Sequence, residues 1–472
     1  MRFYNRRREL SLLEKHYRRA SAGAILDVII GRRRIGKTEL ATQFIKRKNA
    51  FYFFVSRKPL SGLLKEWSGI LREEFSAIGE FSDLEDFLAF LFERASKRKT
   101  IVVFDEFQNF KYIYRPAFSI FQKALDRYKK KSKMYLILIG SLVTLMEKIF
   151  SDNKEPLFGR ATKKIYLRPF DIRTCSHLLR DLKFKKSKEF FDIYSIFNGV
   201  PKYYVLLEEE NLGGKSIDTI IQELIIGPEA NLKKEGEDLL KEEFGKDYQR
   251  YFEILSLLGR GKTKLSEIAS SMKLPTTSIN VYLSKLEKKF KLIERRTPIL
   301  EKPKAKLGRY YLKDTFLIFW FRFVYRYFSW TEGGATKLLL KKIKGDLPAY
   351  QGLIFEKLAR DRVWDLSLQG KFHFTITDIG RFWDKTGENE IDVAAYNSQS
   401  RSIFLAECKI NPGRITKGLL NDLLRKSNLE KFNYFQNKYL GIISFGKISA
   451  RQKSWLAEKR IQFFDVSKVF SK

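Results

Sequence analysis

Residues 31–38 have the composition and spacing of a loop that binds a phosphate chain. They read Gly-Arg-Arg-Arg-Ile-Gly-Lys-Thr, between an apolar run, Ala24–Ile30, and a helix-like stretch, Thr38–Lys46. Glycines let the backbone curl so that several N–H groups point at phosphate oxygens, and the helix N-terminus adds partial positive charge. Lys37 is expected to reach the β- and γ-phosphates, and the Thr38 hydroxyl to bind Mg²⁺. The residues predicted to contact ATP here are Gly31, Arg33, Arg34, Ile35, Gly36, Lys37, Thr38 and Glu39.

An acidic pair follows the next strongly apolar run. Thr100–Phe104 is rich in β-branched residues and ends in Asp105-Glu106. A carboxylate at the carboxyl end of a parallel strand lies at the edge where ligands bind in open α/β sheets. Asp105 is therefore expected to hold Mg²⁺ through water, and Glu106 to polarise the attacking water as a general base.

Two further residues extend this predicted hydrolytic site. The strand-like run Tyr135–Ile139 ends in Gly140-Ser141, and Ser141 could contact the γ-phosphate or the water. Strand ends also carry Gly-Ser for turn chemistry alone. Arg160 could act as a transition-state arginine, in which case a contribution across subunits would require a homo-oligomer; an ordinary surface arginine is the alternative.

A second group of carboxylates lies near the other end of the chain. Glu407 and Lys409 end one strand-like run in the pattern Glu-x-Lys, and Asp392 lies on the preceding run. Period-two geometry puts Glu407 and Lys409 on the same face, which Asp392 can approach if the strands pair as a hairpin. Two carboxylates suit a divalent metal, either Mg²⁺ or Mn²⁺, and Glu356 could add a fourth group. The alternative is salt-bridge decoration of a sheet surface.

The elements that must position these residues divide into three segments. Residues 1–235 alternate strand-like and helix-like runs, which predicts an α/β fold with a parallel sheet of the P-loop NTPase kind and a small helical lid around Gly199-Val200-Pro201. The predicted strands are Ala24–Ile30, Ala50–Val55, Thr100–Phe104, Tyr135–Ile139 and Lys164–Leu167.

Residues 240–345 predict a winged helix. Helices are expected at Tyr248–Leu258, at Leu265–Met272 and from an N-cap at Thr276 to Phe290, followed by strands Leu292–Arg296 and Arg309–Leu312 around a basic loop that includes Lys304. The third helix would enter the DNA major groove. An ordinary packing module for protein contacts is the alternative.

Residues 348–472 predict an α/β domain. It is expected to begin with helix Tyr350–Leu366 and to continue with strands, a helix, a strand, a helix and a final strand. The predicted elements after the first helix are strands Lys371–Ile376, Glu390–Tyr396 and Ser402–Cys408, helix Thr416–Asn428, strand Lys438–Ser444, helix Ala450–Lys459 and strand Ile461–Val466.

Charge and cysteine content limit the classes of partner and compartment. Lys and Arg total 91 against 55 Asp and Glu, a net charge of +36, which favours a polyanion such as duplex DNA. The two cysteines, Cys175 and Cys408, indicate a reducing cytoplasm rather than a disulfide framework. The most apolar stretch, Phe316–Phe328, contains two arginines and is too short to span a bilayer, so we expect no membrane partner.

Together these motifs resemble archaeal ATPases of the signal-transducing (STAND) P-loop class, relatives of AAA+ proteins that often carry a winged helix and a C-terminal domain similar to the PD-(D/E)xK restriction-endonuclease fold. The resemblance implies that Asn5 and Arg6 lie near the nucleotide base and that Pro201 lies near the lid that senses it. The residues that carry it are Phe3, Asn5, Arg6, Glu9, Leu10, the loop with its arginine pair, Asp105-Glu106, Gly140-Ser141, Gly159-Arg160, Arg168-Pro169-Phe170, Gly199-x-Pro201 and the Asp392, Glu407, Lys409 set.

The leading hypothesis is therefore an ATP-hydrolysing, DNA-binding protein with a C-terminal domain that could cut DNA using a metal. Two alternatives stay open. One is a signalling switch of the STAND kind, with slow turnover and a C-terminal fold that only binds. The other is a transcription regulator in which the nucleotide is structural.

Overall fold

The chain divides into two units, which are described separately. Residues 1–170 with 200–205 form the first unit, and residues 171–199 with 206–472 form the second. The computed structural model describes residues 3–76, 78–244, 248–302 and 305–470. Lys304, which the sequence places in a basic loop, lies outside the described residues.

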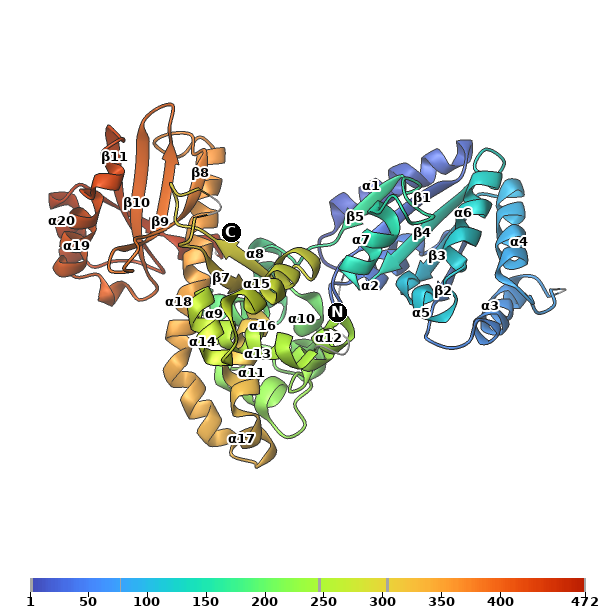
Figure 1. Cartoon of the computed structure of the whole chain (residues 1–472), viewed down its shortest axis with the longest axis horizontal. Coiled ribbons are helices and arrows are strands. Elements are labelled where there is room, and N and C mark those ends of the chain that lie inside the picture. Colours follow the sequence, from blue (N-terminus) through green and yellow to red (C-terminus); the bar gives the residue numbers. More distant parts are fainter. Residues whose placement is uncertain (1–2, 77, 245–247, 303–304, 471–472) are drawn as a thin grey trace. The chain divides into compact units, whose positions relative to one another are not determined.

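A five-stranded parallel sheet forms the centre of the first unit, in the order β2-β3-β4-β1-β5 (Figure 1). β3 and β4 are buried along their whole length, as expected for strands covered on both faces. All five strands were predicted, with boundaries that differ by at most one residue. Their bounds are β1 Ile25–Ile30, β2 Ala50–Phe54, β3 Thr100–Asp105, β4 Met134–Gly140 and β5 Lys163–Tyr166.

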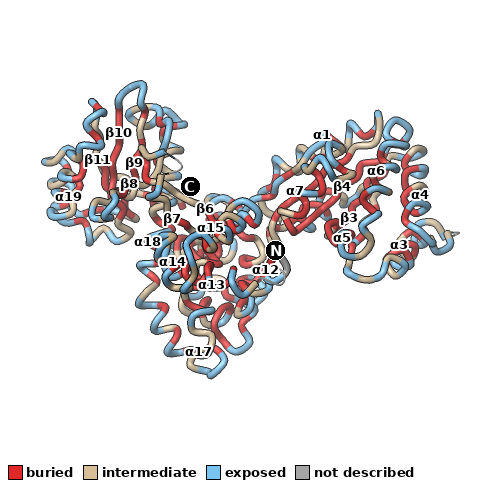
Figure 2. The backbone as a smooth tube through the Cα atoms, in the orientation of Figure 1, coloured by how far each residue is buried: buried red, intermediate tan, exposed pale blue. Residues whose placement is uncertain are grey.

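Helices cover this sheet, and alternate strand residues point to opposite faces. One face packs Val28, Leu136 and Phe104 into a core with Trp67 and Phe121, seen as buried segments in Figure 2. The helices are α1 Arg7–Arg19, α2 Lys37–Ile45, α3 Leu60–Glu74, α4 Leu84–Lys97, α5 Phe110–Ile113, α6 Ala117–Tyr128 and α7 Val143–Ser151.

On the opposite face a buried polar group ties α1 to the sheet. Asp27 Oδ2 lies 2.7 Å from His16 Nδ1 and accepts a hydrogen bond of 2.6 Å from the Tyr135 hydroxyl. Burial raises the pKa of Asp27, because water no longer solvates the carboxylate. The central strands β1 and β4 are thereby anchored to α1.

The second unit begins with helices and contains one that is longer than predicted. Helix α18 runs from Thr336 to Leu368 with Pro348 inside it, whereas the sequence predicted a start at Tyr350. Proline is tolerated here within a helix that packs against β9 and β10. The other helices of this part are α8 Ile172–Asp181, α9 Ser187–Phe197, α10 Pro201–Glu209 (whose first residues belong to the first unit), α11 Ile217–Ile221, α12 Glu235–Phe244, α16 Thr315–Phe319 and α17 Phe328–Glu332.

Three helices and a β-hairpin occupy the segment between α12 and α16. These are α13 (Tyr248–Gly259), α14 (Leu265–Met272) and α15 (Thr276–Ser284), followed by the antiparallel strands β6 (Ile293–Arg296) and β7 (Arg309–Leu312). The predicted cap at Thr276 is wrong, because Pro275 takes the N-cap position and Thr276 is the first helical residue. The predicted extension to Phe290 continues as a π-helical turn, Lys285–Lys289.

A mixed five-stranded sheet closes the second unit, in the order β12-β11-β10-β9-β8. β8, β9 and β10 are antiparallel, whereas β10, β11 and β12 are parallel. The strand predicted at Lys371–Ile376 is wrong: β8 begins at Asp378, because Phe372 and Phe374 pack as aromatic neighbours and the Ile376 N–H bonds the Ser367 hydroxyl. The bounds are β8 Asp378–Trp383, β9 Glu390–Asn397, β10 Ser402–Lys409, α19 Lys417–Ser427, β11 Asn437–Ser444, α20 Ala450–Glu458 and β12 Ile461–Asp465.

Candidate functional site

The phosphate loop connects β1 to the first turn of α2. Arg34 and Gly36 have positive φ angles of 68° and 83°, so the backbone curls in the left-handed region as a phosphate cradle requires. A Cβ on Gly31 would lie 3.1 Å from the Leu167 carbonyl oxygen, which explains a glycine at that position. Lys37 folds back over the loop, and its Nζ donates a 2.9 Å hydrogen bond to the Arg32 carbonyl.

Lys37 is a buried cation at this site. Burial lowers its pKa to about 8, and the negative charges of Glu106 and Asp105 oppose that shift only in part. A bound phosphate would add the negative charge that stabilises the protonated amine. The loop is therefore built to gain from an anionic ligand.

The predicted Mg²⁺ residues lie together at the carboxyl edge of the sheet. Asp105 Oδ2 accepts hydrogen bonds from the Thr38 hydroxyl at 2.5 Å and from the Tyr52 hydroxyl at 2.7 Å. Its other oxygen accepts from the Glu106 backbone N–H at 2.7 Å. Hydroxyl and carboxylate oxygens are the donors that Mg²⁺ prefers, so these residues fit the ion. Sequence reasoning missed Tyr52, which orients Asp105 from the neighbouring strand.

Glu106 is held by two polar side chains. Its Oε2 accepts a 2.7 Å hydrogen bond from the Ser141 hydroxyl and another from the Gln108 amide, which also donates to Ser141 Oγ at 3.2 Å. Glu106 has a left-handed backbone, with φ of 55°, which is uncommon for a residue other than glycine. This arrangement fixes the position of Glu106 Oε2. The sequence did not single out Gln108, although it follows the acidic pair by two positions.

Gly140 makes room for the Gln108 amide. A Cβ at position 140 would lie 2.7 Å from Gln108 Oε1 and 2.3 Å from the Met146 side chain. That amide oxygen is buried and has no hydrogen-bond partner among the residues that the structure describes. Packing therefore requires a glycine at position 140.

Arg6 and Pro201, two of the residues that the family resemblance implies lie near the nucleotide, are close to the phosphate loop. Arg6 is buried, and its Nη2 donates to the carbonyls of Ile35 at 3.2 Å and Arg168 at 2.7 Å while the guanidinium lies over the Phe170 ring. Pro201 Cγ is 3.8 Å from where a Cβ of Gly36 would lie. Asn5, Arg33 and Glu39 are exposed.

Arg160 is not brought to the loop within the first unit. It precedes β5, whose first residue, Lys163, pairs with Asp27 near the start of β1, whereas the loop follows the end of β1. Because these strands are parallel, Arg160 and the loop lie at opposite ends of the sheet. Its Nη2 instead forms a 2.9 Å ion pair with Asp126 Oδ2.

In the second unit the predicted carboxylates converge from three elements. Asp392 on β9 and Glu407 on β10 lie on paired strands, and Glu356 reaches them from α18. Asp392 Oδ2 accepts the Cys408 N–H at 2.9 Å, and Lys409 Nζ lies 3.8 Å from Glu407 Oε2. Burial, followed by the charge of Asp392, raises the pKa of both Glu356 and Glu407 to about 7.

Three cations that the sequence did not reveal already contact this cluster. Lys426 on α19 lies 3.0 Å from Glu407 Oε1, and Arg381 on β8 lies 3.3 Å from Glu356 Oε2. Arg360 on α18 lies 3.9 Å from Glu356 Oε2 and donates a 2.9 Å hydrogen bond to the Asp392 carbonyl. Across the described ranges, no group of three or more His, Cys, Asp or Glu side chains is arranged so that it could hold a metal ion. The carboxylate oxygens of Glu356, Asp392 and Glu407 are of the type that binds Mg²⁺ or Mn²⁺. The basic side chains that already contact them would compete with a metal ion for these oxygens.

The segment between α13 and α14 pairs with β7, which the sequence did not predict. Lys264 forms an isolated antiparallel β-bridge with Arg309, and the Tyr310 N–H donates a 2.8 Å hydrogen bond to the Thr263 carbonyl. On α15, Ile279 and Leu283 are buried, whereas Val281 is 54% exposed. Asn280 is exposed next to Val281, and Lys285 and Lys288 are exposed in the π-helical turn that follows α15.

None of the helices in the described part of the chain has the length and apolar character needed to cross a membrane.

Comparisons with known proteins agree with the fold of the first unit. A family described as an ATPase domain predominantly from Archaea matches residues 3–207, and a family of archaeal and bacterial proteins of unknown function matches residues 320–419. The solved structure of a Walker-type ATPase from Pyrococcus abyssi is similar, with a TM-score of 0.52 and 19% identity over 68% of this chain and 96% of that one. The Aeropyrum pernix ORC2 protein has a TM-score of 0.49 and 15% identity over 72% of this chain and 95% of its own.

An uncharacterized protein of Methanocaldococcus jannaschii extends the match to the second unit. It is 32% identical over 429 residues, which cover 88% of this chain and 90% of the relative. The chain therefore belongs to a family of archaeal P-loop ATPases that join an ATPase domain to this C-terminal domain.

Proposed function

We propose that this ATPase couples nucleotide turnover to the binding of duplex DNA, and that its C-terminal carboxylate cluster cuts DNA with Mg²⁺ or Mn²⁺. The observation that carries the proposal is the convergence of Glu356, Asp392, Glu407 and Lys409, from three elements, onto one site in which Glu407 is buried and the others are partly buried. Gathered carboxylates with raised pKa values are typical of metal-dependent and acid–base chemistry.

At the ATP site each residue has one expected role. Lys37 and the loop N–H groups bind the β- and γ-phosphates, and Thr38 with Asp105 hold Mg²⁺, which would neutralise charge on the phosphates. Glu106 accepts a proton from the attacking water while Ser141 and Gln108 keep its carboxylate oriented. Pro201, beside Gly36, would report the state of the loop to α10.

The DNA-binding part of the proposal rests on element order and charge. A helix, a residue in a β-bridge, two further helices and a hairpin follow one another as in a winged helix. Helix α15 has exposed polar residues, and the turn after it adds the exposed Lys285 and Lys288. A net charge of +36 favours phosphate contacts generally. If Arg160 serves the ATP site of a neighbouring copy, the working form is a cytoplasmic homo-oligomer.

A second candidate function has one observation in its favour. Arg381 and Lys426 already form ion pairs with Glu356 and Glu407, which favours a cluster that is structural. In that case the chain is a STAND-type switch or a transcription regulator with slow turnover, and the C-terminal domain only binds.

Supercoiled plasmid separates these functions. Purified protein is incubated with plasmid and Mg²⁺ or Mn²⁺, with and without ATP, and both strand breaks and phosphate release are measured. We expect breaks from wild type and from Lys37→Ala, but none from Glu407→Gln, and phosphate release from wild type and Glu407→Gln only. Arg425→Ala, an exposed position on α19 beside Lys426, is the matched control and should cut normally. Intact plasmid with wild type under every condition would reject the nuclease and favour the switch.

A further inference from the structure

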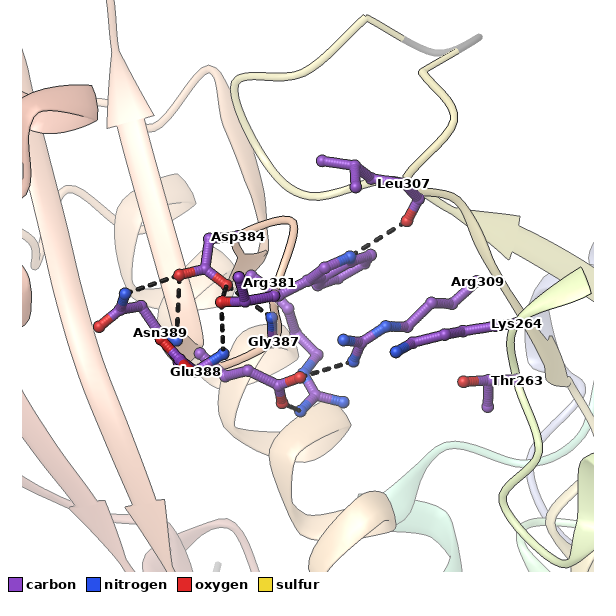
Figure 3. Close-up of polar contacts among 12 residues, drawn as sticks. Thr263, Lys264, Leu307, Arg309, Arg381, Asp384, Gly387, Glu388 and Asn389 are labelled. Carbon is purple, nitrogen blue, oxygen red and sulfur yellow. Dashed lines mark hydrogen bonds and ion pairs between the residues drawn. The ribbon is translucent and has the colours of Figure 1, made fainter. Parts of the chain in front are cut away.

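The hairpin β6–β7, with Ile299 and Leu307 from the segment between its strands, packs against the edge of the C-terminal sheet (Figure 3). The Ile299 N–H donates to the Arg381 carbonyl at 2.8 Å, and Trp383 Nε1 donates to the Leu307 carbonyl at 3.1 Å. Arg309 of β7 forms a 2.7 Å ion pair with Glu390 of β9 and lies over the Trp383 ring. Two elements that sequence separates by about eighty residues thus share one charged seam.

Arg381 connects this seam to the carboxylate cluster. Its guanidinium lies 3.4 Å from Glu390 Oε2, 3.3 Å from Glu356 Oε2 and 3.9 Å from Asp392 Oδ1. Tight charge-assisted pairs have separations of about 2.7–2.9 Å. Its Nε is buried and has no hydrogen-bond partner among the described residues. Arg381 is therefore shared among three carboxylates and held closely by none of them.

The charge of Glu390 affects how strongly Arg381 is attracted to Glu356 and Asp392. Its Oε1 pairs with Arg309 and its Oε2 faces Arg381, so the two arginines compete for one negative charge. While Arg309 neutralises Glu390, the attraction of Arg381 to Glu356 and Asp392 prevails. A divalent cation bound by those carboxylates would lie close to the guanidinium and be repelled by it.

We propose that the hairpin controls whether the carboxylate cluster holds Arg381 or a divalent cation. With Arg309 on Glu390, Arg381 stays at Glu356 and Asp392 and excludes the metal. When a backbone phosphate of duplex DNA takes Arg309, Glu390 draws Arg381 away and the cluster accepts Mg²⁺ or Mn²⁺. This inference rests on the proposed metal site and adds its regulation. DNA bound by the hairpin allows the cluster to bind the metal ion.

Mn²⁺ binding to the nucleotide-free full chain tests the proposal. Free Mn²⁺ is followed by electron paramagnetic resonance at fixed pH, with Glu407→Gln defining the signal that belongs to the cluster. We expect Arg309→Ala to bind Mn²⁺ about tenfold more tightly than wild type, and Glu390→Gln to bind about tenfold more weakly. A short duplex should tighten Mn²⁺ binding by wild type and leave Arg309→Ala unchanged.

Lys431→Ala is the matched control. It removes a 2.7 Å ion pair between Lys431 and Glu301 that also joins the hairpin segment to the C-terminal domain, but it does not touch Glu390 or Arg381. Its Mn²⁺ affinity should equal that of wild type. The opposite shifts of Arg309→Ala and Glu390→Gln cannot both arise from unfolding, so these two variants carry the test.

The outcomes separate this inference from the proposed function. If Glu407→Gln loses a Mn²⁺ site that Arg309→Ala and Glu390→Gln leave unchanged, or shift in the same direction, the coupling is wrong and the metal site stands. If neither wild type nor Arg309→Ala binds more Mn²⁺ than Glu407→Gln does, even with duplex present, both the metal site and its regulation are wrong.

Discussion

Lys37 should take up a proton when ATP binds. Burial lowers its pKa to about 8, so about half of the chains carry a neutral Lys37 at about pH 8. Phosphate oxygens beside the amine favour its charged form, and binding should therefore draw about half a proton per ATP from the buffer at that pH. At about pH 6.5 the amine is already protonated, and Lys37 itself should take up almost no proton.

Calorimetry in two buffers with different ionisation enthalpies measures this uptake directly. The terminal phosphate of ATP, with a pKa of about 6, is fully ionised at pH 8 and does not contribute. ATP affinity should fall about fivefold between about pH 8 and pH 9, because one proton must be supplied to each binding event.

Lys37→Arg provides the control for that experiment, because a guanidinium remains protonated throughout this range. Its binding heat should be the same in both buffers. Equal heats for wild type at pH 8, or an equal buffer dependence in Lys37→Arg, would refute the assignment of the titrating group.

Three further predictions concern Gln108, the carboxylates Glu356 and Glu407, and the lysines after α15. Gln108→Leu should lower kcat about 10- to 150-fold with KM for ATP unchanged, because it removes a hydrogen bond to a charged group worth about 1.5–3 kcal/mol. Steady-state phosphate release, with Gln108→Glu as a second variant, checks this. Mn²⁺ affinity at Glu356 and Glu407 should rise with pH and level off above about pH 7, because both pKa values are raised to about 7 and the metal needs the ionised carboxylates. Titration of Mn²⁺ at several pH values measures this, and an affinity independent of pH would contradict the prediction. Replacing Lys285 and Lys288 together by Ala should reduce the slope of log K against log salt for duplex DNA by about 2. An unchanged slope in fluorescence anisotropy would show that the turn after α15 does not contact DNA phosphates.

The strands of the first unit were predicted closely because their signals are local. Strands buried on both faces are continuous apolar runs, so β3 and β4 could be located from their residues alone. The loop at residues 31–38 and the acids after β3 are placed by strand direction, which brings their ends to one edge.

The rest of the candidate site depends on pairing that only the folded chain reveals. Tyr52 reaches Asp105 from a neighbouring strand, and Lys426 reaches Glu407 from a helix that follows it. Arg381 was hidden because the strand that carries it was expected several residues earlier, at Lys371–Ile376. Side-chain partners of this kind follow from register and packing and leave no periodic signal in the sequence.

The central claim is that the loop and the acidic pair bind and hydrolyse ATP, and Glu106→Gln tests it most directly. The amide keeps the shape of the side chain and removes the base, so ATP affinity should match that of wild type while phosphate release falls about 10²- to 10⁴-fold. Filter binding of labelled ATP and single-turnover phosphate release, measured on the same preparation, give both quantities. An unchanged rate of release, or the absence of ATP binding to the wild-type chain, would contradict the account.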